Sequence, residues 1–168
     1  MMPESSAVEA KIYRMIDGNV DAIKAIDEVI AKAATTLRIF DYSLDNRGFN
    51  SPERFEALRQ FMLRSRANEI QIVLHNTDAL ERDCPRLLML LRQFPTGVRI
   101  HRATGVAQQA QDPFIIADQM HFWHKLHYQH PRSVLTLNSH FDTKPLLDRF
   151  DEIWECSEFA VSASAIGL

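Results

Sequence analysis

The sequence predicts an α/β fold, with a mixed, largely parallel central sheet and helices on both of its faces. In the first hundred residues, short apolar segments alternate with segments of helical apolar spacing. Three apolar segments then follow between residues 114 and 137 with no helix between them. Strands joined through helices need crossover connections and pair in parallel, whereas consecutive strands give a mixed sheet. A chain of 168 residues, 46% of them apolar, is large enough for one core.

The first half of the chain alternates strands and helices. After an entry strand, Gly18 breaks the pattern and Asn19 is placed to cap a helix whose apolar residues recur at helical spacing. Ser51-Pro52-Glu53 is a typical helix start, with a capping hydroxyl, a proline and an acidic residue in order. The expected elements are strands over 11–16, 37–42, 69–75 and 98–101, and helices over 20–35, from 51, and from 83 to 94.

The second half begins with a polar loop over 104–111, which we expect to be the most mobile internal segment. Strands are expected over 114–117, 121–128 and 134–137. A last helix follows, capped by Asp142 or Thr143, with Phe150 and Trp154 on its inner face. Residues 158–168 are expected to form a loosely held tail.

Composition and charge exclude several classes of protein. The net charge of −3 argues against a polyelectrolyte, and the longest apolar run, residues 87–91, is far too short for a membrane span. The start of the chain has no apolar leader, so we expect a cytoplasmic protein of bacterial type. Cys84 and Cys156 lack metal-finger spacing and are expected to be reduced. The glycines occur singly, so no nucleotide motif is present and no cofactor is expected.

The segment Gln111–Asp118, followed by Asn138 and by the closing helix, resembles the phospholipase-D-like superfamily over residues 11–157. The signature of that family is His-x-Lys, four further residues and Asp, carried on a strand. The resemblance implies a single phospholipase-D-like domain over 1–168, with its core at about 11–157. Because family members with one motif pair about a two-fold axis, it also implies a homodimer.

The motif departs from the family pattern at the positions that carry the chemistry. In the family, one His attacks phosphorus, another protonates the leaving oxygen, and Lys and Asn hold the phosphoryl oxygens. Here Gln111 and Pro113 replace His and Lys, and only Asp118 remains. Glutamine is neither a phosphoryl nucleophile nor a proton shuttle, and proline has no side-chain donor. The first hypothesis is therefore a non-catalytic binding or interaction module.

A basic region suggests what such a module binds. Arg47, His75, Arg102 and Arg132 lie at or after predicted strand ends, where open α/β sheets bind ligands. With Asn138, they are candidates for an anion-binding cleft that takes a phosphate-containing ligand. The alternative is that these are ordinary solvated side chains on different faces. The net acidity and the absence of a nucleic-acid-binding motif argue against a nucleic-acid partner.

Histidines offer two further hypotheses. His121, His124, His127 and His130 recur at every third residue, which suggests a metal site. On a strand, however, His121 and His127 would face one side and His124 and His130 the other, so a polar, aromatic strand at a sheet edge or dimer contact is the favoured interpretation and no metal ligands are assigned. The other hypothesis is an active phosphodiesterase or nuclease in which a relocated histidine does the chemistry, with candidates at His75, His101, His124 and His130.

Overall fold

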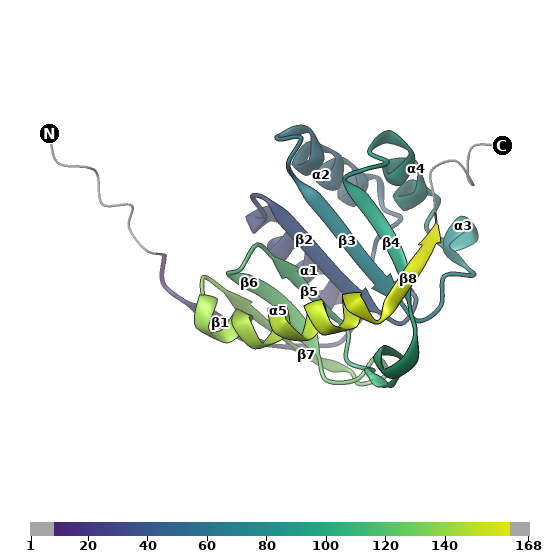
Figure 1. Cartoon of the computed structure of the whole chain (residues 1–168). Coiled ribbons are helices and arrows are strands. Elements are labelled where there is room, and N and C mark those ends of the chain that lie inside the picture. Colours follow the sequence, from purple (N-terminus) through teal and green to yellow (C-terminus); the bar gives the residue numbers. More distant parts are fainter. Residues whose placement is uncertain (1–8, 162–168) are drawn as a thin grey trace, which may run out of the picture.

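The computed structural model describes residues 9–161, which form one eight-stranded mixed sheet with helices on both faces (Figure 1). The strands run across the sheet in the order β1-β7-β6-β5-β2-β3-β4-β8. The strands are β1 Ile12–Asp17, β2 Thr36–Asp41, β3 Glu69–Leu74, β4 Val98–Ala103, β5 Phe114–Ala117, β6 His121–Lys125, β7 Arg132–Leu137 and β8 Ser157–Val161. The helices are α1 Asn19–Lys32, α2 Pro52–Leu63, α3 Leu80–Asp83, α4 Pro85–Gln93, α5 His140–Glu155 and a short 3-10 helix, η1 Gly105–Gln109.

The sheet has a parallel centre and antiparallel flanks. β2 pairs in parallel with β3, and β3 with β4, while every other neighbouring pair is antiparallel. Helices connect the parallel strands, as the alternating pattern predicted, and the consecutive strands β5, β6 and β7 form a meander. The predicted fold class, a mixed α/β sheet, is confirmed.

Two apolar layers lie on opposite faces of the sheet. Helices α1, α2 and α4 cover one face, where Ile26, Phe61 and Leu90 are fully buried. On the other face α5 runs across the strands with η1 beside it, and Phe150 lies in the same apolar cluster as Phe40 (Figure 1). The single helix leaves part of this second face uncovered.

Several helix boundaries differ from the expected ones. Gly18, with a φ of 83°, takes the N-cap position of α1 instead of Asn19. At α5 the cap is Ser139, whose hydroxyl accepts from the amide of Asp142. The helix expected over 83–94 is preceded by a separate short helix that ends at Asp83, because Pro85 starts a new helix. Both cysteines are free thiols, as predicted.

Two segments expected to be loosely held are ordered instead. The loop over 104–111 contains η1, in which Ala107 is buried. The start of the expected tail forms β8, which pairs with the outer edge of β4 and places Glu158 opposite Arg102. The prediction of a loosely held tail was therefore wrong for residues 158–161. An unpaired strand edge offers backbone hydrogen bonds to any adjacent extended segment, and β8 uses the edge of β4 in this way. Residues 162–168 lie outside the described range.

The strand expected over 121–128 ends at Lys125, and the next residues form a loop above the sheet edge. Within residues 9–161, no helix combines the length and the apolar character that crossing a membrane requires.

Candidate functional site

The candidate site lies at the edge of the sheet where the parallel strands end. Asp41 and Leu74 are register partners at the ends of β2 and β3. The antiparallel strands bring the beginning of β5 and the end of β6 to this same edge, with Phe114 opposite His124. Open α/β sheets bind their ligands at this carboxyl edge. A cavity of about 480 Å³ opens here, and its lining includes Asp41, Tyr42, Asp45, Arg47, Lys125 and Tyr128.

A buried ion pair forms the floor of this edge cavity. Nε of Arg47 donates to Oδ2 of Asp41 at 2.8 Å, and the two residues are only 5% and 4% exposed. The loop after β2 turns back through Leu44 and Asn46, both in the left-handed region, and this brings Arg47 over the strand end. The guanidinium also lies 5.3 Å from the ring centre of Trp123. Burial raises the pKa of the Asp41 carboxyl, and the attraction of Arg47 opposes that shift.

Lys125 supplies the uncommitted positive charge of the cavity. It is half-buried and lies on the same face of β6 as Trp123, two residues earlier. Its ammonium group makes no hydrogen bond or ion pair within residues 9–161. Burial and then the nearby Arg47 lower its pKa, whereas Asp41 opposes the shift. Because Arg47 is already paired with Asp41, Lys125 is the cation free to meet a ligand.

Four aromatic rings form a continuous stack along one wall of the cavity. The ring centres of His75 and Tyr42 are 5.7 Å apart, those of Tyr42 and Tyr128 are 4.9 Å apart, and those of Tyr128 and His127 are 4.6 Å apart. The rings come from the ends of β2 and β3 and from the loop after β6. The stack therefore holds together segments that are distant in the sequence.

Residues 110 and 111 hold both ends of this stack. Nε2 of His127 donates to Oε1 of Gln111 at 2.7 Å, and Nε2 of His75 donates to the carbonyl of Ala110 at 2.5 Å. The amide of Lys125 donates to the carbonyl of Pro113 at 2.8 Å. Ala110 and Gln111 therefore position this wall of the cavity, and Pro113 anchors β6 at Lys125.

Asp118, the third motif residue, lies at the opposite edge of the sheet, after β5. Its carboxylate accepts hydrogen bonds from the amides of Ala34, Thr35 and Thr36. Burial raises its pKa, but these backbone donors outweigh burial, so the pKa lies below its usual value. Asp118 therefore fixes the turn that leads into β2 and does not line the edge cavity.

Comparison with known proteins places the chain in a family. A family described as a domain of unknown function, DUF7931, matches residues 19–163. The chain belongs to the DUF7931 family. No curated protein matches the sequence of this DUF7931 domain.

Solved structures give the fold of the DUF7931 domain. It is similar to Nuc, a phospholipase D family member from Salmonella typhimurium, with a TM-score of 0.63 and 15% identity over 91% of this chain and 100% of that chain. NucT from Helicobacter pylori is similar with a TM-score of 0.60 and 12% identity, over 90% of this chain and 100% of that chain. TrmBL2, an archaeal chromatin protein with a novel mode of DNA binding, is similar with a TM-score of 0.66 and 14% identity. The match covers 94% of this chain and 57% of that chain. The domain therefore has the phospholipase-D-like fold that the motif predicted.

The five predicted anion-binding residues of the DUF7931 domain do not converge. Arg47 and His75 lie at the edge cavity, and Arg132 is exposed farther along the same edge. Arg102 is paired with Glu158 of β8. Asn138 is at the opposite edge, where its side chain donates to the carbonyl of Ala10, because β7 runs in the direction that carries its end away from the cavity.

The sequence analysis did not identify Asp41, Lys125 and Tyr128 as residues that line the edge cavity. Asp41 ends the apolar strand β2, which is a usable signal for a site at a strand end. Lys125 and Tyr128 carried no such signal, because both had been assigned to a longer strand.

All seven histidines of the DUF7931 domain are engaged in hydrogen bonds. His121 and His124 point to opposite faces of β6, while His127 and His130 lie in the following loop. Within residues 9–161, no three histidine, cysteine or acidic side chains are grouped as metal ligands would be. The histidine series therefore does not converge into one site.

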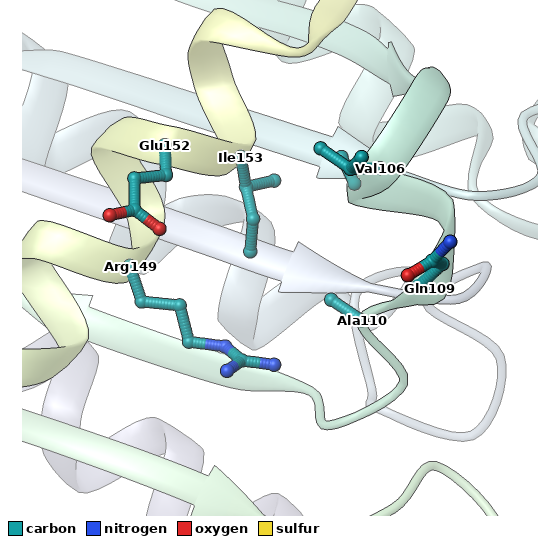
Figure 2. A pocket seen from close by; sticks show the side chains of 7 residues that line it. Val106, Gln109, Ala110, Arg149, Glu152 and Ile153 are labelled. Carbon is teal, nitrogen blue, oxygen red and sulfur yellow. The ribbon is translucent and has the colours of Figure 1, made fainter.

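A second, smaller cavity of about 280 Å³ lies between η1 and α5 (Figure 2). Figure 2 shows Arg149 and Glu152 on the helix side, with Val106 and Gln109 facing them. The guanidinium of Arg149 is paired with Asp112, which also accepts from Nε2 of His124 at 2.8 Å. Arg149, the cation that lines this smaller cavity, is thus already paired with a carboxylate. The cavity therefore offers an anion no unpaired positive charge among its lining residues, in contrast to the edge cavity.

Proposed function

We propose that the DUF7931 domain is a non-catalytic module that binds a small anionic, phosphate-containing ligand in the edge cavity. The observation that carries this proposal is the half-buried ammonium of Lys125, which faces the cavity without a partner in the described part of the chain. A partly desolvated cation interacts more strongly with an anion than an exposed one does.

The surroundings of Lys125 favour an anionic group of modest size. The Arg47 charge is balanced by Asp41, so the floor is close to neutral. Asn19, at the start of α1, lines the same cavity, and no side chain caps that helix. Helix N-termini attract anions, which adds to the effect of Lys125. Asp45, an exposed residue in the lining, disfavours ligands with a large negative charge.

The same geometry argues against catalysis at this edge. Gln111 carries an amide and is occupied by His127. His75 donates from Nε2 to a backbone carbonyl, and so acts as a fixed structural group in the stack. A nucleophile is activated by the loss of a proton to a base, and the carboxamide of Gln111 has no group that ionises near neutral pH.

A phosphodiesterase that uses His124 is the second candidate. The contact with Asp112 orients the imidazole of His124, as a carboxylate orients a catalytic histidine. However, His124 lies on the α5 face of β6, whereas Lys125 faces the edge cavity from the other side. A reaction at His124 would therefore proceed without the cation of the cavity.

Calorimetric titration with inorganic phosphate and with glycerol phosphate tests the binding proposal. We expect saturable binding, and we expect Lys125→Gln to weaken it at least tenfold. The matched control, Lys144→Gln, removes an exposed lysine paired with Asp148 and should leave affinity unchanged. Equal affinity in the two variants would refute the role of Lys125.

Hydrolysis of bis(4-nitrophenyl) phosphate tests the second candidate on the same preparations. Turnover that disappears in His124→Ala and persists in His140→Ala would establish a relocated histidine and overturn the non-catalytic proposal.

We also infer that the domain forms a homodimer through β1. This strand is at the end of the sheet, and Tyr13 and Met15 are 57% and 61% exposed on the face that α5 shares. A second copy paired with this edge would satisfy its outer backbone groups and cover both side chains.

A further inference from the structure

On one face of the sheet α5 crosses only part of the strands (Figure 1), and a row of polar residues on β2, β3 and β4 lies on this face. Arg38 on β2 pairs in register with Gln71 on β3, and Gln71 pairs with Arg99 on β4. Phe40 and Val73 follow two residues after Arg38 and Gln71 and pack against α5, so the row lies on the same face as that helix. Neighbouring strands are about 4.8 Å apart, so the three side chains start within about 10 Å of one another.

Both arginines in the row have an unsatisfied buried donor. Nε of Arg38 and Nε of Arg99 are buried, and neither has a hydrogen-bond partner within residues 9–161. Arg38 donates from Nη1 to the hydroxyl of Thr36 at 3.1 Å and has no carboxylate partner there. Arg99 contacts Glu69 at 3.2 Å and lies over the ring of Trp154. Buried donors are nearly always paired, so two orphaned donors in one row indicate a missing acceptor.

A cavity next to Arg38 provides room for a ligand. Its volume is about 510 Å³, and Thr36, Arg38, Gln119 and His140 are among its lining residues. Asp118 also lines it, but the amides of residues 34–36 and the hydroxyl of Thr35 surround that carboxylate. The Arg38 guanidinium, which has no carboxylate partner within residues 9–161, is therefore the permanent positive charge among these lining residues, whereas the Asp118 carboxylate is held by backbone donors.

We propose that Arg38 and Arg99, with Gln71 between them, bind the phosphate group of a small phosphorylated ligand whose remainder occupies this cavity. A guanidinium presents a planar set of donors that matches an oxyanion. Three side chains supply donors here, and the three oxygens of a phosphate use them better than the two of a carboxylate. The row lies on the α5 face, opposite the face of Lys125, so it does not depend on the function proposed for the edge cavity.

Titration of 15N-labelled full-length protein, followed through the arginine Nε–H resonances, tests this site. With inorganic phosphate, the signals of Arg38 and Arg99 should shift together and saturate, and acetate should bind at least tenfold more weakly. Arg38→Gln should weaken the response at Arg99 at least tenfold. The matched control is Arg102→Gln, which removes an arginine of the same strand β4 paired with Glu158, and it should leave the titration unchanged. Lys125→Gln should also leave it unchanged.

A second variant separates loss of binding from loss of folding. Arg38→Lys keeps the charge and removes the planar donor set, so it should weaken phosphate binding while the other amide resonances keep their positions. Shifts that never saturate, or that are equal in Arg38→Gln and the unmodified protein, would overturn the proposal. A response confined to a single-stranded oligonucleotide or to an acidic peptide would overturn it as well.

Discussion

Oε1 of Gln111 accepts a hydrogen bond from Nε2 of His127 at 2.7 Å, and this contact joins the degenerate motif to the loop above the sheet edge. The backbone carbonyl of Gln111 also accepts from the amide of Tyr128 at 2.8 Å. Two adjacent loop residues are thus held by one motif residue. At the position where the family resemblance would place a reactive histidine, this chain has a structural anchor.

Gln111→Ala should release the loop over 126–131 without unfolding the domain. Because a single exposed hydrogen bond contributes little, the free energy of unfolding should fall by about 1 kcal/mol or less. Hydrogen exchange of the amides of 127–130 should become faster. Gln109→Ala, at an exposed position in η1, is the control and should leave exchange in this loop unchanged. Unaltered exchange in Gln111→Ala would show that the ring stack holds the loop without this anchor.

Asp41→Asn should be strongly destabilising, because it leaves the Arg47 guanidinium buried without a counter-charge. Breaking a buried ion pair typically costs about 3–5 kcal/mol, which chemical denaturation would measure directly. Asp83→Asn removes the carboxylate of an exposed pair with Arg82 and should change stability very little. Equal effects from the two substitutions would mean that water solvates the floor of the edge cavity.

Asp118 should make stability dependent on pH in the acid range. Its pKa is lower in the folded chain than the ordinary value of 3.8, so it stabilises the fold above that value. This contribution is lost as the pH falls through the folded pKa. Asp118→Asn should reduce stability by about 1 kcal/mol at neutral pH and flatten the acid limb of the stability profile. Asp151→Asn, at an exposed position of α5, should reproduce the unmodified profile.

Met15→Lys should shift the domain from dimer to monomer in light scattering at micromolar concentration. A charge at the centre of β1 opposes the edge-to-edge pairing proposed for the two copies. Met89→Lys, at an exposed position of α4 on the other layer, is the control and should preserve the dimer. A monomer in the unmodified protein would rule out the β1 interface.

The order and type of most elements, and with them the fold class, could be predicted from the sequence alone. Local residue patterns within one segment specify these elements. Strand β3 has consecutive apolar residues, and helix α2 has Ser51 and Pro52 at its start. The prediction that Gln111 and Pro113 stand in place of reactive residues also rests on the sequence, through its resemblance to the family. These features depend only on neighbours along the chain.

The tertiary structure decided which of these residues meet. Asp41 pairs with Arg47, and His75 and His127 bond to residues 110 and 111. The start of the expected tail forms β8, and Asn138 lies at the edge of the sheet opposite the cavity. Each outcome depends on strand order and on which way a strand runs. Those are set by the burial of whole sheet faces and by pairing between distant segments, and no local pattern of residues encodes them.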